Sequence, residues 1–264
     1  MFGQIQPTPY DLRFEILGIP IRVHPIFWLT SAWLAWVPGR MDIVLVRVLC
    51  IFLAILVHEM GHALMTRRFG WQSEIVLYIL GGYATSMRHT TGKDIAVSAA
   101  GPAAGFLLLL TIWIPCQLSG LLLPQSTLMF PVFNIDAMQN WPSVVSLGSR
   151  GNELLLDAID FSFFINFVWT VVNLLPVLPL DGGQISREYW NWARPRNGME
   201  ICIKLSMISS GAVAAWSAFS VTNPDAPWTI GRLFGLDSLF LGLMFGYLCY
   251  QSYQELQNMR GRYW

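Results

Sequence analysis

Long apolar runs separated by short polar stretches dominate the chain from about residue 23 onward. A helix needs about 20 apolar residues to cross the hydrocarbon core of a bilayer, because each residue advances it by only about 1.5 Å. The runs predict six spanning helices, near residues 23–38, 43–66, 94–117, 158–179, 199–220 and 235–252. The first run is the shortest, and its tryptophans also suit an anchor at the membrane surface. The pattern predicts an α-helical polytopic membrane protein.

Two stretches beside the early helices follow a different pattern. "FEILGIPIRVH" (14–24) and "SEIVLYILGGYATSM" (73–87) are rich in β-branched and aromatic residues and are interrupted by glycine, which is typical of short strands joined by turns. We expect a small β-sheet or hairpin element between the early helices. A strand edge at membrane depth must be buried in protein or line a wet cavity, because lipid offers it no hydrogen-bond partners. A polar interior is therefore expected.

Composition agrees with a membrane protein. Hydrophobic residues make up 54% of the chain and charged residues only 12%, which is too little polar surface to coat a water-soluble globule. The formal net charge is zero, and the sequence shows no clustered basic face, so we expect no nucleic-acid partner. The stretch from about 118 to 157 has no readable period and is the longest predicted loop.

The distribution of lysine and arginine predicts the orientation. Of the 16 lysines and arginines, the face that holds both termini and the loops after the second and fourth spans carries twelve: Arg13, Arg22, Arg67, Arg68, Arg88, Lys93, Arg187, Arg194, Arg196, Lys204, Arg260 and Arg262. The opposite face carries the other four, Arg40, Arg47, Arg150 and Arg232. By the positive-inside rule we expect both termini on the cytoplasmic side of the membrane. We expect that membrane to be a bacterial inner membrane.

The second span contains "HEMGH", residues 58–62. His58 and His62 are four residues apart, so both imidazoles lie on one side of a helix and can bind the same zinc ion. Zinc lowers the pKa of a bound water toward about 7, and Glu59 is placed to take the proton. A chance pattern, with histidines bonded to neighbouring helices, is the alternative. Ionisable groups within a membrane span favour function, because the bilayer makes them costly. Gly61 and Ala63 are small enough to let a partner helix come close.

A catalytic zinc has three protein ligands and one open position, so a third ligand is needed. Asp181 in "NLLPVLPLDGGQI" is the best candidate. The second and fourth spans both run from the outer face inward, so His62 and Asp181 are both expected near the cytoplasmic side. Pro176 and Pro179 break the helix just before Asp181 and free the backbone to bring the carboxylate inward. Asp-Gly-Gly is also a turn signal, so a plain turn is the alternative.

Asn173 lies eight residues before Asp181 in an apolar helix. It could steady the oxyanion that develops during hydrolysis or hold an unwound substrate. The alternative is a hydrogen bond to a neighbouring helix, as is common for amides in membrane helices.

At these residues the chain resembles the site-2 protease family of intramembrane zinc metalloproteases. The matching stretches are "GIPIRVHPIFWL", "HEMGH", "LGGYATSM", "AAGPAAGF" and "NLLPVLPLDGG", in the family's order. The resemblance implies a single membrane-embedded metalloprotease domain over 1–264, with a cytoplasmic strand segment at 1–22, core helices over about 23–220 and a last span at about 235–252. The chain ends about a dozen residues after that span, so no PDZ or CBS module is expected.

The resemblance also implies the chemistry. It implies one Zn²⁺ per chain held by His58, His62 and Asp181, with Glu59 as general base and Asn173 as a transition-state helper. The substrates that it implies are single-span membrane proteins, such as tethered transcription regulators or anti-sigma factors, or signal-peptide remnants. A substrate helix would unwind and pair with the strand near 75–87, which Gly81 and Gly82 allow to bend, although these glycines equally suit an ordinary turn.

Two further positions bear on substrate binding. His24 matches a histidine in the N-terminal segment of related members and could lie near the cavity mouth; an interfacial histidine is the alternative. Many members carry Asn where this chain has Gly105, which leaves a substrate-gripping role for that position open.

Two other function classes remain open. One is a catalytically silent scaffold that binds membrane helices, which the intact HExxH and Asp181 disfavour. The other is a zinc-dependent transporter, for which two related halves or polar residues in several spans would be expected. Neither feature is seen in the sequence, and the sequence does not identify the oligomeric state or the cleavage site.

Overall fold

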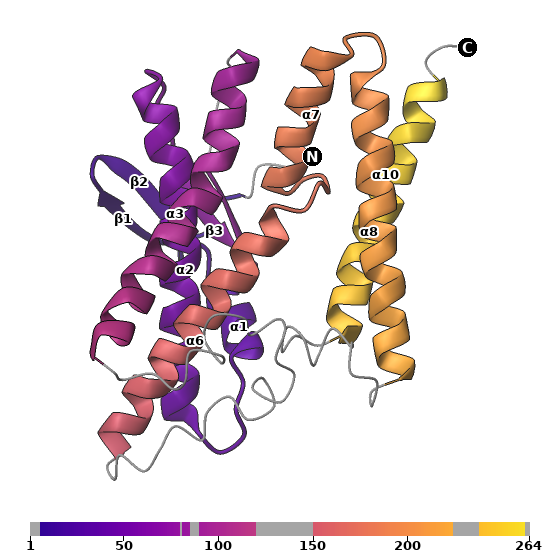
Figure 1. Ribbon diagram of the computed structural model, residues 1–264. Helices are drawn as coiled ribbons and strands as arrows, with labels where there is room; N and C mark the ends of the chain where they lie inside the picture. The colour runs from indigo at the N-terminus through magenta and orange to yellow at the C-terminus, as the bar shows by residue number, and fades with distance from the viewer. Residues whose placement is uncertain (1–5, 80, 85–89, 120–149, 224–237, 262–264) are drawn as a thin grey trace. The chain divides into compact units, whose positions relative to one another are not determined.

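The computed structural model of the chain describes residues 6–79, 81–84, 90–119, 150–223 and 238–261. Within these ranges the chain is mainly helical and contains one small β-sheet (Figure 1). The chain divides into two compact units: unit 1 is Met1–Trp113 with Gly148–Val171, and unit 2 is Ile114–Leu147 with Val172–Trp264.

The sheet of unit 1 is built from the two stretches that the sequence predicts as strands. Its four strands lie in the order β1-β2-β3-β4: Leu12–Ile16, Ile19–Val23, Ile75–Tyr78 and Gly81–Ala84. The pairs β1-β2 and β3-β4 are antiparallel, and β2-β3 is parallel. Leu17 and Gly18 join β1 to β2 with φ of 51° and 73°, the left-handed backbone of a tight hairpin turn. The predicted sheet is confirmed.

Four helices begin in unit 1: α1 (Pro25–Leu34), α2 (Met41–Arg68), α3 (Thr91–Ser119) and α6 (Arg150–Asn173). Helix α1 has 10 residues and is about 15 Å long, so it is too short to cross a bilayer and the first predicted span is wrong. It stops before Val37-Pro38-Gly39, where proline and a glycine at φ 74° do not continue a helix.

The count of six spans is not confirmed. Among the described residues three helices are long and apolar enough to cross a membrane: Met41–Arg68, Thr91–Pro115 and Gly198–Thr222. Helix α6 has 24 residues but starts at Arg150, inside the stretch expected to be a loop, so the loop prediction is wrong from Arg150 onward. The rest of that stretch, from 120 to 149, lies outside the described residues.

The core of unit 1 lies between α2 and the sheet. Val48, Ile51 and Ile55 form a buried stripe along α2, and Phe27 and Leu77 pack in the same cluster. This stripe follows the helical period, and its next members along α2 are His58, Glu59 and His62. The apolar face that anchors α2 therefore also buries the HExxH residues.

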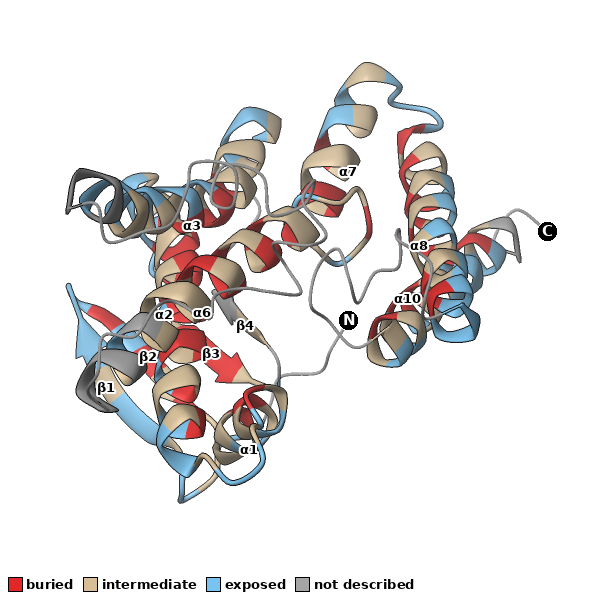
Figure 2. Cartoon of the chain, turned by 60° about the horizontal axis from the view of Figure 1, so that its bottom comes forward, coloured by how far each residue is buried: buried red, intermediate tan, exposed pale blue. Residues whose placement is uncertain are grey.

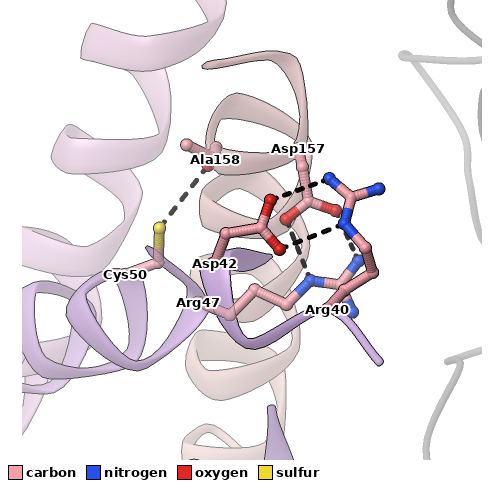
Figure 3. Close-up of polar contacts among 6 residues, drawn as sticks. All are labelled: Arg40, Asp42, Arg47, Cys50, Asp157 and Ala158. Carbon is pink, nitrogen blue, oxygen red and sulfur yellow. Dashed lines mark hydrogen bonds and ion pairs between the residues drawn. The ribbon is translucent and has the colours of Figure 1, made fainter. Parts of the chain in front are cut away.

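An ion pair joins α2 to α6 at a position nearer the start of α2 than the HExxH residues. The Arg47 guanidinium donates from Nε and Nη2 to the two carboxylate oxygens of Asp157, at 3.0 and 2.5 Å (Figure 3). The guanidinium carbon lies 4.9 Å from the ring centre of Phe161, and the Cys50 thiol donates to the Ala158 carbonyl oxygen one turn away. A bidentate pair of this kind specifies the register of the two helices, because a shift of one helix along the other would separate the two charges.

Unit 2 contains α7 (Asp181–Ala193), α8 (Gly198–Thr222) and α10 (Ser238–Gly261). Leu241, Phe245 and Leu248 of α10 form its buried cluster together with Val177. The Ser206 hydroxyl of α8 accepts from the N–H of Leu178 at 2.9 Å, so the segment before α7 is bonded to α8. The predicted fourth span, 158–179, is too long at its end, because α6 stops at Asn173 before the proline-rich segment.

The Arg47–Asp157 pair predicts a loss of stability on charge removal. Asp157→Asn should lower the free energy of unfolding by about 2 kcal/mol. Breaking a fully buried pair costs about 3–5 kcal/mol, and the loss is smaller here because the two side chains remain partly exposed. Denaturant unfolding in detergent measures the change. Asp42→Asn, which removes the exposed Arg40–Asp42 pair, is the matched control and should cost less than about 1 kcal/mol. An equal loss in both variants would show that the Arg47–Asp157 pair contributes no more stability than the exposed pair, contrary to this prediction.

Candidate metal centre

The two histidines of HExxH are buried on α2 and face each other. His58 is 2% exposed and His62 8%, and their Nε2 atoms lie 3.2 Å apart. Two imidazole nitrogens bound to one tetrahedral zinc at about 2.0–2.1 Å would be separated by about 3.3 Å. The observed spacing therefore fits two ligands of a single zinc ion.

A hydrogen bond to α3 fixes which ring nitrogen of His62 is a donor. Its Nδ1 lies 2.7 Å from the carbonyl oxygen of Val97. A carbonyl oxygen can only accept, so Nδ1 carries a proton and Nε2 is the nitrogen left for a metal ion. Metal-binding histidines commonly donate their other ring N–H to an acceptor of this kind.

A glycine on α3 provides the space that the imidazoles occupy. A Cβ at Gly101 would lie 2.2 Å from Nε2 of His62 and 2.8 Å from Nε2 of His58. On α2, a Cβ at Gly61 would lie 2.3 Å from the Ala100 carbonyl oxygen. The close approach expected from Gly61 is confirmed, and Gly101 is the partner that the sequence reasoning missed, although "AAGPAAG" carries the signal as a run of small residues.

The glycine pair of β4 lies beside the HExxH residues. A Cβ at Gly82 would lie 2.9 Å from Cγ and 3.2 Å from Cδ of Glu59, so the bare backbone of β4 packs on the side chain of this buried glutamate. A Cβ at Gly81 would contact the ring of Trp169 at 3.7 Å. That ring lies edge-on to His58, with centroids 6.5 Å apart. Sequence reasoning missed Trp169, which has no motif of its own.

Gly105 lies one turn after Gly101 on α3 and faces α6. A Cβ at this position would be 2.5 Å from the Thr170 hydroxyl oxygen, and Thr170 is 1% exposed. A side chain at 105 would therefore displace Thr170. In this chain a hydroxyl from α6 fills the space next to position 105.

His24 has a structural role at the end of β2. Its Nδ1 accepts from the N–H of Ile26 at 3.2 Å and so caps α1. Its own N–H donates to the Leu77 carbonyl oxygen at 3.0 Å, and its ring packs edge-on against Tyr78. The contacts hold the start of α1 on the sheet; binding of substrate by His24 stays a prediction.

In unit 2, Asp181 is the first residue of α7, and Asn173 is the last of α6. A Cβ at Gly182 would lie 2.1 Å from the Leu174 carbonyl oxygen, and one at Gly183 would lie 2.5 Å from the Val177 carbonyl. The two glycines are needed because the segment between α6 and α7 folds back onto the first turn of α7. This packing fixes the backbone that carries Asp181.

The ligand chemistry of the three predicted residues suits zinc. His58 and His62 each offer an imidazole nitrogen from unit 1, and Asp181 offers a carboxylate from unit 2. Two imidazoles and one carboxylate are a donor set of catalytic zinc sites, and such sites leave one position open.

A short sheet packed on membrane-length helices, with a buried HExxH on one of them, defines a helical membrane protein with a metallopeptidase-type site. A family model for Peptidase family M50 matches residues 46–213, more than half of the chain. The chain belongs to this family, and the resemblance to site-2 proteases read from the sequence is confirmed.

Individual relatives agree with this family. The chain is 25% identical over 219 residues to stage IV sporulation protein FB of Bacillus subtilis, covering 81% of this chain and 63% of that protein. It is 25% identical over 182 residues to zinc metalloprotease MJ0392 of Methanocaldococcus jannaschii, covering 67% of this chain and 45% of that protein. The chain therefore spans less than two thirds of the length of either relative.

The fold is also similar to a solved structure, the site-2 protease from Methanocaldococcus jannaschii. The TM-score is 0.52 at 19% identity, over 94% of this chain and 95% of that chain. Family membership and the buried histidine pair together support zinc as the metal cofactor.

The contact of Gly101 with both imidazoles predicts how zinc binding can be lost. Gly101→Ala places a methyl group where His58 and His62 meet, so purified protein should lose most of its zinc. Metal analysis by inductively coupled plasma mass spectrometry measures the content. Gly92→Ala is the matched control on the same helix, because nothing lies within 4 Å of its added Cβ. Full zinc content in Gly101→Ala would rule out the site.

Proposed function

We propose that the chain is an intramembrane zinc metallopeptidase that hydrolyses peptide bonds within or near transmembrane segments of other membrane proteins. The observation that carries the proposal is the buried His58–His62 pair on α2, with its Nε2 atoms 3.2 Å apart and His62 fixed by Val97. Peptidase family membership supports the reaction class.

We propose His58, His62 and Asp181 as the ligands of one zinc ion per chain. Zinc bound there supplies a Lewis acid that acidifies water and polarises the scissile carbonyl group. Each histidine offers a ring nitrogen to the ion, and Asp181 offers a carboxylate oxygen. Asp181 is suited to this role because its backbone is fixed at the first turn of α7 by the packing at Gly182 and Gly183.

Glu59 serves as general base and then as general acid. Its carboxylate takes a proton from the attacking water as the water oxygen bonds to the carbonyl carbon, and it delivers that proton to the leaving nitrogen as the C–N bond breaks. Its burial at 5% exposed and its packing against Gly82 restrict the carboxylate to few positions. Asn173 donates a hydrogen bond to the oxyanion that develops on the substrate carbonyl.

The substrates that we propose are single-span membrane proteins or signal-peptide remnants. A transmembrane helix must unwind before cleavage, because its carbonyl groups are shielded by internal hydrogen bonds. Strand β4 is at the edge of the described sheet, and its Gly82 contacts Glu59. An extended substrate paired along β4 would regain its backbone hydrogen bonds next to the base. Gly81 and Gly82 let β4 lie close to Trp169 and Glu59, and His24 holds the neighbouring strands to α1.

We propose that this chain is a multi-pass protein of the bacterial inner membrane with both termini in the cytoplasm. The excess of lysine and arginine on the face of both termini supports this orientation.

Glu59→Gln tests the base. The amide cannot accept the proton, so cleavage of a single-span substrate should fall by about 10²–10⁴-fold while zinc content is unchanged. Quantitative membrane proteomics of wild-type and variant cells would reveal the substrates as stabilised single-span fragments. Cleavage of these substrates by the purified wild type and variant is then measured by gel electrophoresis. Undiminished cleavage by the variant would eliminate Glu59 as the base.

Asp181→Ala tests the third ligand. Loss of one of three protein ligands should release most of the zinc at neutral pH, because the imidazole pair alone holds the ion weakly. Glu188→Gln is the matched control, since it removes a buried carboxylate of the same helix that is paired with Arg187. Zinc retained in Asp181→Ala and lost in Glu188→Gln would refute the ligand assignment.

A further inference from the structure

The turn between α7 and α8 forms an exposed tip of unit 2. The Arg194 carbonyl oxygen accepts from the N–H groups of Asn197 and Gly198, at 3.0 and 2.7 Å, and so closes the turn. A Cβ at Gly198 would lie 2.3 Å from the Trp190 carbonyl oxygen, which makes this a tight connection. The side chains of Arg194 and Arg196 are exposed, and within the described part of the chain neither forms an ion pair. The tip therefore presents two uncompensated positive charges.

Aromatic side chains lie beside these charges on α7. Ile185, Tyr189 and Trp192 are spaced i, i+4, i+7 and share one face of the helix. Tyr189 is 49% exposed and Trp192 69%, and their rings pack at a centroid distance of 6.4 Å. Figure 2 shows the exposed colour at the end of α7 and along the turn that follows. Tyrosine and tryptophan of this kind are enriched where membrane meets water.

The position of α8 places the tip at a membrane surface. Helix α8, Gly198–Thr222, is long and apolar enough to cross a bilayer, and it begins two residues after Arg196. The tip must therefore lie where this span leaves the hydrocarbon core. The nearest other cations are neutralised, because Lys204 pairs with Glu200 at 2.7 Å and Arg187 pairs with Glu188 at 2.9 Å.

We propose that this tip is a binding site for anionic phospholipid headgroups. Arg194 and Arg196 bind the lipid phosphates, and Tyr189 and Trp192 insert among the headgroups and the first carbons of the acyl chains. Charge complementarity selects an anionic lipid over a zwitterionic one, because the tip itself has no carboxylate to satisfy its arginines. The site lies within unit 2 and does not depend on the peptidase reaction.

Native mass spectrometry of the full-length protein in detergent tests the proposal. Phosphatidylglycerol and phosphatidylcholine are titrated separately, and the dissociation constant of the first bound lipid is measured. The wild type should bind phosphatidylglycerol more tightly than phosphatidylcholine. Arg194→Gln/Arg196→Gln should weaken phosphatidylglycerol binding on the order of tenfold and leave phosphatidylcholine unchanged. Arg194→Lys/Arg196→Lys should keep most of the preference, because it preserves the charge.

Two controls make the result decisive. Arg13→Gln/Arg40→Gln removes the same charge from two elements of unit 1 and should leave lipid binding unchanged. A photoreactive benzoylphenylalanine at position 192, in liposomes containing phosphatidylglycerol, should cross-link to lipid, whereas one at buried Phe245 should not. Unchanged phosphatidylglycerol binding in the Gln variant, an equal loss in the control, or no cross-link at position 192 would each overturn the proposal.

Discussion

The close approach of α2 and α3 is the contact on which the metal centre depends. It requires glycine on both helices, because a Cβ at Gly61 would meet the backbone of α3 and a Cβ at Gly101 would meet the histidine rings of α2. Helices that approach this closely gain dispersion contacts that large side chains would prevent. The same approach brings the Val97 carbonyl within hydrogen-bond distance of His62. One packing contact thus holds the helices together and determines which ring nitrogen of His62 donates to α3.

The buried polar groups of unit 1 are tolerated because each lies in a specific structural setting. His58, Glu59 and His62 continue the apolar stripe of α2, so the helix buries them along with its core side chains. The aromatic ring of Trp169 and the bare backbone at Gly82 cover them. Such surroundings exclude bulk water and strengthen electrostatic interactions, which favours metal binding and restricts the Glu59 side chain. The Arg47–Asp157 pair keeps α6, and with it Trp169, in a fixed register with α2.

The sequence predicts local features well where one residue type has one physical explanation. HExxH at helical spacing predicts that two histidines face one another, and Pro176 with Pro179 predicts the break before Asp181. The glycine-interrupted β-branched stretches predict the sheet. Length alone was misleading for the first span, because tryptophans and prolines extend an apolar run beyond the helix that it forms. Gly101 and Trp169 could not be identified, because their importance comes from contacts between segments far apart in the chain. Whether Asn173 and His24 act on substrate depends on a bound substrate, which a sequence does not describe.

The bond from His62 to Val97 has a consequence for how the site withstands mutation. Its acceptor is a main-chain carbonyl group, and every residue type supplies one. Replacing the valine side chain therefore cannot delete the acceptor, whereas a carboxylate in the same role would be lost through a single codon change. The orientation of the His62 ring therefore depends on the backbone path of α3, and substitutions at position 97 leave it intact as long as that helix keeps its course.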